Sequence, residues 1–439
     1  MTALRRSALR WADPLAIAAI VVHLALVLSL RVTAWPEVTT PAYLWSRGML
    51  LYRDIKFSHT PGTMGTLALA FFALGVHTWV VRAYAIVGPL VAHLFVLKHT
   101  RPFSRPERAL ASLFFLSVFF SLEGNSVWPT GLLAALSLPI AAALSRGRIF
   151  QAGLLIGVAI LFKQTAAYVL LVAMIGLAVR TRWREAGKLF LAGCLPYGLT
   201  LGLFAALGAG PEMLRWTLGV NLTLVPGVVS FRPGWYEISV LFFAFLPIVG
   251  EAILERPGEY DVRSRWLLVV ALGMAAICYP RFDLAQTVGA VPCLAVGAAR
   301  FLRRQPGFQL FRAAAFGCVL AVTVSRAFVL FSGRYFDGKV VFWNEEPALD
   351  ALAARLRRFP RDTPLHSPLW ENVLPRSGLL PPGRLYVNPF FTWLFPVDDV
   401  GERIQAAIRR EGALVIEPAS SSAGEVVGPY AIRLIKPRS

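Results

Sequence analysis

The feature that most constrains this chain is a series of apolar runs, which recurs from near residue 13 to about residue 331. Hydrophobic residues make up 56% of the 439 residues and charged residues only 16%, whereas about 25% of the residues in soluble domains are charged. Runs of this length and frequency indicate helices that cross a lipid bilayer. The pattern predicts an all-α polytopic membrane protein with about eleven transmembrane helices. The candidate spans are 13–33, 78–97, 109–122, 130–144, 149–163, 165–179, 189–207, 237–252, 266–279, 284–301 and 313–331.

The distribution of Lys and Arg predicts the orientation of these spans. With the N-terminus in the cytoplasm, the segments on that side carry twenty Lys and Arg residues, and the opposite segments up to Arg281 carry nine. Cytoplasmic loops of membrane proteins are enriched in Lys and Arg, so we expect a plasma-membrane protein with a cytoplasmic N-terminus. The same asymmetry accounts for much of the net charge of +19. Nucleic acid is therefore not an expected partner, whereas membrane lipids are.

Segment 63–76, "TMGTLALAFFALGV", is the difficult case because it is apolar enough to pass for a short span. If it crossed the membrane, every later loop would change sides and the Arg-rich loops would face outward, against the usual bias. We therefore predict a helix that lies in the interface or dips into the outer leaflet. This assignment produces a large first external loop, residues 34–77.

The chain changes in character after about residue 333, where the apolar runs shorten and charge returns. Helical apolar spacing and short strand-like runs alternate there, and they predict a small α/β domain outside the cytoplasm. The helical segments are 346–359 and 397–412, and the strand-like segments are 384–389 and 413–418. The expected organisation is a transmembrane domain, 1–333, followed by an extracytoplasmic α/β domain, 334–439.

On this topology the external polar residues gather where an anionic, lipid-linked substrate could be bound. Arg, Lys and His can hold phosphate, and a carboxylate can take a proton from an incoming hydroxyl or amine. The candidates are Glu37, Arg53, Asp54, Lys56 and His59 in the first external loop, Glu123 in the second, Lys163 in the third, Glu212 and Arg215 in the fourth, and Arg281 and Asp283 in the fifth.

Three motifs resemble those of membrane glycosyltransferases with the GT-C fold. "RGMLLYRDIKFSHTPGTMGTLALAFFALG" (47–75) is similar to their first-loop pattern, in which Tyr-Arg-Asp precedes a Pro and an apolar helix. "QAGLLIGVAILFKQTA" (151–166) is similar to their Lys-Gln-Thr span end, and "YPRFDLAQTVGAVPCLAV" (279–296) to their late Pro-Arg-Phe-Asp loop. The resemblance is to the protein-O-mannosyltransferase-like family 39 and the lipopolysaccharide-core glycosyltransferase-like family 83. It covers most of the first 300 residues.

The resemblance implies a polyprenyl-phosphate-linked sugar as donor and a glycan, lipid or protein as acceptor. A first-loop carboxylate would act as base, with inversion at the sugar. Arg53, Lys56, His59, Lys163 and Arg281 would then bind phosphate, because cations stabilise the charge that develops on a leaving phosphate. Lipid phosphate is already a good leaving group, and the four cysteines lack the paired spacing of zinc ligands. We therefore expect neither a metal nor another cofactor.

This sequence departs from the family pattern at the expected base. The family commonly has an Asp about twenty residues before the Asp of Tyr-Arg-Asp, and here that position falls on Ala34 and Trp35. The nearest acid is Glu37. Three interpretations remain: Glu37 is the base, Asp54 is the base, or the chain has lost transfer activity.

Each candidate residue also has a purely structural interpretation. Arg53 and Asp54 could form a local ion pair, and Lys56 and His59 could meet lipid headgroups. Glu123 and Lys163, at the ends of short spans, could pair with each other, although ionisable groups at membrane depth usually mark a functional site. Arg281 and Asp283 could form a salt bridge at a helix end.

Two other functions compete with glycosyl transfer. A transporter or flippase of lipid-linked sugars should carry polar residues in the middle of several spans, yet the spans here are nearly free of charge. A non-catalytic scaffold with the glycosyltransferase fold is consistent with the missing Asp.

Overall fold

The structure, a computed structural model, describes residues 13–30, 32–122, 124–223, 234–254, 262–279, 284–303, 309–331, 340–341, 347–368, 372–388, 398–419 and 424–437. The chain divides into two compact units. We call residues 1–32, 85–199 and 229–339 the helical unit, and residues 33–84, 200–228 and 340–439 the mixed unit. The mixed unit thus combines the first external loop with the C-terminal region. The sequence prediction instead divides the chain at residue 333, and that boundary stays a prediction.

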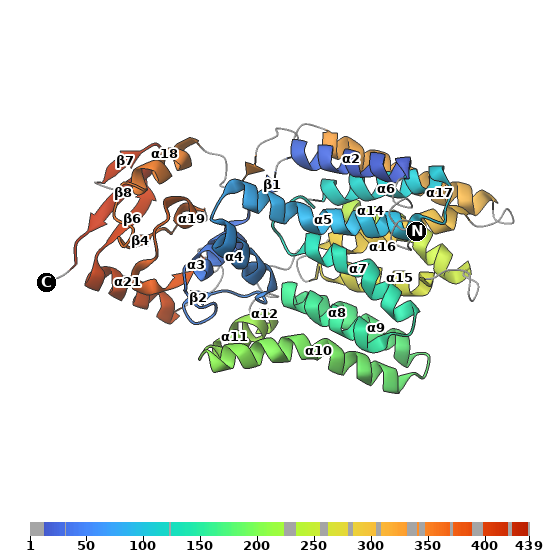
Figure 1. The fold of residues 1–439 in the computed structure, drawn as a ribbon, viewed down its shortest axis with the longest axis horizontal. Helices are drawn as coiled ribbons and strands as arrows, with labels where there is room; N and C mark the ends of the chain where they lie inside the picture. Colours follow the sequence, from blue (N-terminus) through green and yellow to red (C-terminus); the bar gives the residue numbers. More distant parts are fainter. Residues whose placement is uncertain are drawn as a thin grey trace, which may run out of the picture. The chain divides into compact units, whose positions relative to one another are not determined.

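Every segment predicted to span the membrane contains a helix (Figure 1). The helices are α2 (Pro14–Ser29), α5 (Thr78–Thr100), α6 (Arg105–Ser121), α7 (Thr130–Ser145), α8 (Ile149–Phe162), α9 (Ala167–Ala178), α10 (Trp183–Ala206), α14 (Trp235–Leu254), α15 (Ser264–Ala276), α16 (Val291–Arg303) and α17 (Gln309–Phe331). A 3₁₀ helix, η3 (Leu284–Ala290), leads into α16.

Within the described residues, three helices are long and apolar enough to cross a membrane: Thr78–Thr100, Trp183–Ala206 and Ala285–Arg303. The last of these joins most of η3 to α16. Several of the other helices are apolar but shorter. The count of eleven spans therefore stays a prediction.

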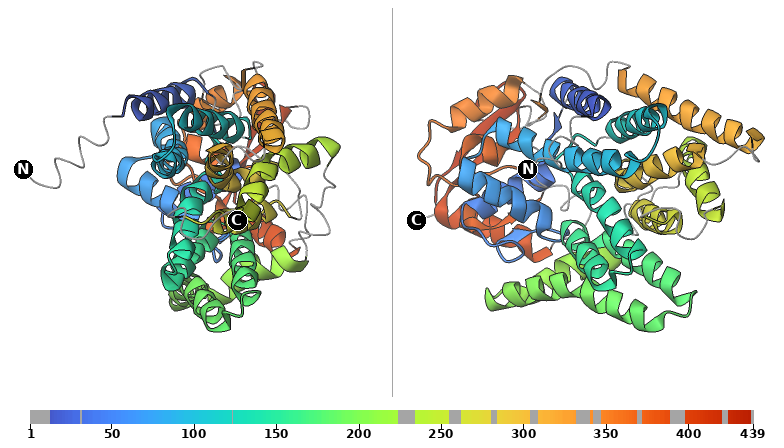
Figure 2. Two further views of the ribbon diagram at one scale, coloured as in Figure 1. Left: turned by 90° about the vertical axis from the view of Figure 1, so that its right-hand side faces the viewer. Right: turned by 45° about the vertical axis from the view of Figure 1, so that its right-hand side comes forward.

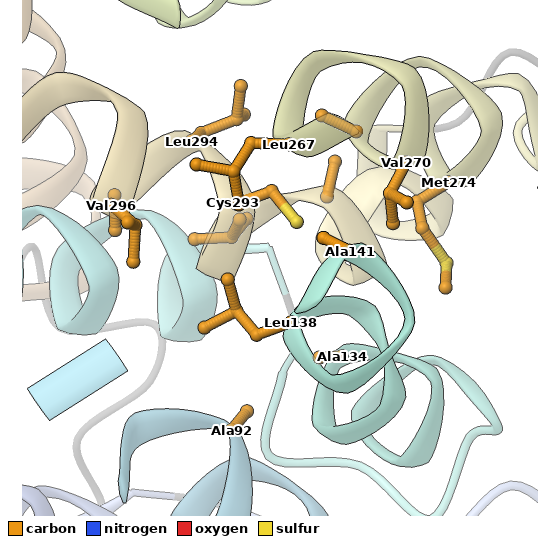
Figure 3. Close-up of a cluster of buried hydrophobic side chains, with 14 of the residues drawn as sticks. Ala92, Ala134, Leu138, Ala141, Leu267, Val270, Met274, Cys293, Leu294 and Val296 are labelled. Carbon is orange, nitrogen blue, oxygen red and sulfur yellow. The ribbon is translucent and has the colours of Figure 1, made fainter. Parts of the chain in front are cut away.

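The core of the helical unit draws on most of its helices, including buried phenylalanines of α6. In one part of it, side chains of α5, α7, α15 and α16 meet. Figure 3 shows Leu138 of α7 and Leu267 of α15 on either side of the Cys293 thiol, which is fully buried. Among the described residues, no disulfide bond joins Cys194, Cys278, Cys293 or Cys318.

Glycines let the helices of this unit approach closely. A Cβ on Gly88 of α5 would lie 2.7 Å from the backbone carbon and oxygen of Gly131 in α7. A Cβ on Gly157 of α8 would lie 2.5 Å from the Gly193 oxygen in α10, and Figures 1 and 2 show α8, α9 and the first part of α10 running side by side. Small residues permit this approach, which is characteristic of helix packing in membranes.

The mixed unit contains short helices and a four-stranded sheet with the order β4-β6-β8-β7. Strand β4 (Leu365–His366) is parallel to β6 (Ala413–Pro418), and β8 (Tyr430–Ile435) is antiparallel to both β6 and β7 (Glu425–Val427). The accompanying helices are α3 (Pro36–Ser46), α4 (Gly62–Leu74), α11 (Gly210–Leu214), α12 (Val220–Thr223), α18 (Pro347–Leu356), α19 (Val373–Ser377) and α21 (Asp398–Glu411). The predicted helices near 346–359 and 397–412 and the strand at 413–418 are confirmed, and the predicted strand at 384–389 contains β5 (Tyr386–Val387).

Helix α4 corresponds to the segment that we predicted not to cross the membrane. Its 13 residues span about 20 Å at 1.5 Å per residue, which is shorter than a hydrocarbon core of about 30 Å. It packs on α3 within the mixed unit. Its position relative to a bilayer stays a prediction.

A short pairing joins the first loop to the C-terminal region. Strand β2 (Ile55–Lys56) runs parallel to β5 (Tyr386–Val387), with Ile55 opposite Tyr386. This pairing fixes the loop segment that contains the Tyr-Arg-Asp motif.

Candidate functional site

The loop between α3 and α4 turns at Tyr52, whose backbone has a positive φ of 69°. A bulky residue seldom adopts this conformation, and it persists only where the surroundings hold it. The Tyr52 side chain is fully buried, its hydroxyl donates to the His59 carbonyl at 2.8 Å, and its ring meets Phe204 edge-on at 5.1 Å. The turn is therefore rigidly positioned, and it places Arg53 and Asp54 side by side.

Asp54 is committed to this turn through both carboxylate oxygens. Arg53 Nε donates to Oδ1 at 2.9 Å, and Oδ2 accepts from Arg53 Nη2 at 3.0 Å and from the Leu50 amide at 2.8 Å. Partial burial raises the pKa of Asp54, but these hydrogen bonds and the charges of Arg53 and Arg384 outweigh burial and lower the pKa below its ordinary value. The ion pair considered from the sequence is present, and it makes Asp54 a weak base.

Glu37 has a different setting, in the first turn of α3 directly after Pro36. A carboxylate is favoured at this position because the backbone N–H groups of a helix N-terminus carry partial positive charge. The side chain is half-buried. Burial raises the pKa of the Tyr386 phenol, and the nearby negative charge of Glu37 raises it further.

Tyr386 connects the two candidate bases. Its amide donates to the Asp54 carbonyl oxygen at 2.8 Å, while its side chain lies beside Thr40 and Glu37. Glu37 therefore lies near the side chain of Tyr386, and Asp54 lies near its backbone amide. The Asp54 carboxylate is neutralised by Arg53, which donates to both of its oxygens.

Lys56 is buried and faces the segment after α10. Its Nζ donates to the Tyr52 carbonyl at 3.0 Å and forms a salt bridge at 3.3 Å with Glu212 of α11. Asn221 of the same segment donates to the Ser58 carbonyl. The structure thus brings together two loops that the sequence analysis treated as separate polar clusters.

The segment that receives these contacts contains a π-helical turn, Arg215–Gly219, immediately after α11. Such turns are rare and frequently occur at functional sites. His59, half-buried, packs edge-on against Phe57 with 5.1 Å between ring centroids. Arg53, by contrast, is exposed.

The helical unit has its own polar cluster around Lys163, at the end of α8. The Lys163 side chain is buried, its Nζ donates to Gln286 Oε1, and it lies 5.7 Å from the centre of the Trp128 ring. Trp128 Nε1 donates to the same oxygen at 3.2 Å. A buried cation is thereby held by an amide and an aromatic face from two other segments, an arrangement that orients it firmly.

Three predicted site residues, Glu123, Arg281 and Asp283, lie outside the described residues. In the part of the chain that is described, no group of three or more His, Cys, Asp or Glu side chains is arranged to hold a metal ion.

No pattern in the sequence marks Tyr386, Gln286 or Asn372 as site residues. The Asn372 side chain accepts from Thr39 and Thr40 and donates to the Ala34 carbonyl at 3.0 Å. These residues meet partners more than a hundred positions away, so no local spacing marks them.

The comparisons identify a fold. No family model matches the sequence, and no curated protein sequence matches it. The crystal structure of ArnT from Cupriavidus metallidurans bound to undecaprenyl phosphate matches with a TM-score of 0.63 at 14% identity, over 97% of this chain and 98% of that chain. The apo structure of the same ArnT matches with a TM-score of 0.60 at 14% identity, over 98% of both chains. The chain therefore has the GT-C fold that its motifs led us to expect.

Proposed function

We propose that this protein is a membrane glycosyltransferase that moves a hexosyl or pentosyl group from a polyprenyl-phosphate carrier to a glycan, lipid or protein acceptor. The observation that carries the proposal is the full-length agreement in fold with ArnT, which was crystallised with undecaprenyl phosphate. The three motifs that resemble families 39 and 83 support the same reaction, and such an enzyme would serve the synthesis of a cell-surface polysaccharide or glycoconjugate.

In the proposed reaction the acceptor hydroxyl attacks the anomeric carbon from the face opposite the phosphate. The hydroxyl proton passes to a carboxylate, the bond between the anomeric carbon and the phosphate oxygen breaks, and the carrier leaves as polyprenyl phosphate. The configuration at the sugar is inverted. The reaction as written requires no metal, because the phosphate is a good leaving group and cations can stabilise its charge.

We assign the base to Glu37 in preference to Asp54. A general base needs a pKa near the working pH and an oxygen that can reach the reacting proton. Arg53 and the Leu50 amide occupy the Asp54 oxygens and lower the pKa of this carboxyl group. Asp54 then has a positioning role, in which it holds the Tyr52 turn.

Lys163 and the first-loop cations are the proposed phosphate ligands. Lys163 is buried among Gln286 and Trp128, where a charge interacts more strongly than in water. Arg53 and His59 are accessible, whereas Lys56 is buried against Glu212. We therefore expect Lys56 to stabilise the loop. Lys163 in the helical unit, and Arg53 and His59 in the mixed unit, are separate candidates for contact with phosphate.

We place the reaction on the extracytoplasmic face of the plasma membrane. The excess of Lys and Arg in the predicted cytoplasmic loops supports this orientation. A single cysteine at position 340, in a chain without the native cysteines, should react with an impermeant label on intact cells. Labelling only after permeabilisation would reverse the orientation.

The function is tested with the purified full-length protein in nanodiscs. The protein is offered undecaprenyl-phosphate sugars and a membrane lipid extract as acceptor, and the release of undecaprenyl phosphate is measured. The proposal predicts release that depends on the acceptor. Binding of donor without release would instead indicate a non-catalytic protein of this fold.

A further inference from the structure

The first turn of α3, which carries the proposed base Glu37, is poorly held by the helix itself. Pro41 lies within α3, and proline has no amide hydrogen to donate to the carbonyl four residues earlier. That carbonyl belongs to Glu37. Trp35, directly before the helix, provides no side-chain hydrogen bond to cap it. The orientation of this turn therefore depends on contacts from outside α3.

Asn372, directly before α19, supplies such contacts on both sides of Glu37. Its Nδ2 donates to the Ala34 carbonyl at 3.0 Å. Its Oδ1 accepts from the Thr40 hydroxyl at 3.3 Å and also from the Thr39 hydroxyl. All three of these side chains are almost completely buried, where a hydrogen bond is stronger than in water. One amide thus ties the segment before Glu37 to the segment after it.

Tyr386 of β5 reaches the same turn from a second part of the C-terminal region. Its phenol forms a hydrogen bond with the Thr40 side chain and lies close enough to Glu37 to interact with its charge. Its amide donates to the Asp54 carbonyl at 2.8 Å, which fixes its backbone. Burial raises the pKa of the phenol, and the charge of Glu37 raises it further. The phenol therefore stays protonated and adds no charge beside the carboxylate.

Tyr43 offers a comparison within the same helix. It too is buried and joins α3 to the C-terminal region, because its hydroxyl donates to the Leu379 carbonyl at 3.2 Å. It lies about two helical turns beyond Glu37. If the contacts to α3 only stabilised the fold, the hydroxyls of Tyr43 and Tyr386 would be equivalent. If they orient the base, only the hydroxyl of Tyr386 affects the reaction.

We propose that Asn372 and Tyr386 are positioning residues that hold the first turn of α3, so that the Glu37 carboxylate keeps one orientation for proton transfer. This inference rests on the proposed function, because it takes Glu37 as the base. It gives the C-terminal region an indirect part in the reaction, through residues that need not touch donor or acceptor. Small misplacements of a reacting group, of about 1 Å, can reduce a rate about 100-fold.

The first experiment measures the release of undecaprenyl phosphate by the full-length protein in nanodiscs, across donor concentrations and pH. The test variants are Tyr386→Phe and Asn372→Ala, and the matched control is Tyr43→Phe. Both test variants should lower kcat at least ~10-fold with little change in KM for the donor. Tyr386→Phe should also shift the acid limb of the pH profile of kcat, which reports the base.

The control should keep the wild-type kcat and pH profile. Tyr43→Phe and Tyr386→Phe should melt at similar temperatures, because each loses one buried hydroxyl group. Wild-type kcat and pH profiles in both test variants, or an equal loss of kcat in Tyr43→Phe, would overturn the positioning role.

The second experiment does not depend on turnover. Tyr386 is replaced by 3-fluorotyrosine in the full-length chain, and its ¹⁹F resonance is followed from pH 4 to pH 8. Ionisation of Glu37 should move the resonance, and Glu37→Gln should abolish that movement. Asn372→Ala should reduce it, because the carboxylate is no longer held beside the ring.

An unchanged movement in Asn372→Ala, or one that survives Glu37→Gln, would overturn the inference whether or not the protein is active. Absence of release by wild type would instead count against the proposed function, and the fluorine measurement would still decide whether Asn372 holds Glu37 beside Tyr386.

Discussion

The helical unit and the mixed unit hold their charged side chains in different environments. In the helical unit, Lys163 is buried and held by the neutral groups of Gln286 and Trp128. In the mixed unit, Arg53 is exposed and pairs with Asp54, a carboxylate that is only partly buried. A charge in a low-dielectric interior interacts several times more strongly than one in water. Substitutions in the helical unit should therefore have large effects, and those at the loop surface small ones.

The largest effect is expected where helices of the helical unit touch through glycine. Gly88→Leu would place a Cβ 2.7 Å from the backbone of Gly131, which cannot move aside as a side chain can. We expect a loss of ~3 kcal/mol or more in stability, measured as a lower melting temperature in detergent. Gly198→Leu is the control, because a Cβ at that position would meet nothing within 4 Å. Equal melting temperatures would show that α5 and α7 do not approach this closely.

The next effect is on catalysis rather than on folding. Lys163→Met removes the buried cation and should reduce the rate of undecaprenyl phosphate release by about 100-fold, the usual loss for one stabilising group. Its melting temperature should not fall, because an apolar side chain of similar length replaces the charge. Lys188→Met, at an exposed position near the start of α10, should release the carrier at the wild-type rate. A normal rate in Lys163→Met would make Lys163 a structural residue.

A smaller effect is expected on stability in the first loop, and it should depend on pH. In the folded protein the pKa of Asp54 lies below its ordinary value of 3.8. The stability that the charged carboxylate contributes is therefore fully present above about pH 4. It is lost as the pH falls through the folded-state pKa. Asp54→Asn should lose about 1 to 2 kcal/mol at pH 7, and this loss should shrink as the pH is lowered below 3.8. Melting curves of both proteins from pH 7 downward measure the difference. A gap that does not shrink as the pH falls until wild type unfolds would contradict the account.

The smallest effect is expected for the exposed partner of this pair. Arg53→Gln should change the stability only slightly, because surface ion pairs contribute little. Its melting temperature should therefore stay within a few degrees of wild type. A loss as large as that of Asp54→Asn would show that the Arg53 side chain, rather than the Leu50 amide, holds the Tyr52 turn.

The sequence predicted the local structure better than the site. Apolar runs specify helices directly, and each predicted span contains one. The strands at 384–389 and 413–418 were predicted from their composition, whereas β4, β7 and β8 were not. Short strands are defined by pairing with distant segments, as β2 is with β5, and no local pattern encodes such partners.

The same limit applies to the site residues. Glu37, Asp54 and Lys163 stood out because charge is rare in this chain, but their neighbours Tyr386 and Gln286 are ordinary residues of a strand and a span. The engagement of both Asp54 oxygens depends on the turn at Tyr52, whose left-handed backbone is unusual for tyrosine. A sequence pattern cannot show that a conspicuous acid is already occupied.

The most direct test of the account compares the two acids in one assay. Glu37→Gln and Asp54→Asn are purified in nanodiscs, and the release of undecaprenyl phosphate from the donor that wild type uses is measured for each at pH 7. The account predicts that Glu37→Gln loses at least ~100-fold in rate, whereas Asp54→Asn keeps most of its rate once its lower stability is taken into account. A wild-type rate in Glu37→Gln together with an inactive but folded Asp54→Asn would contradict it.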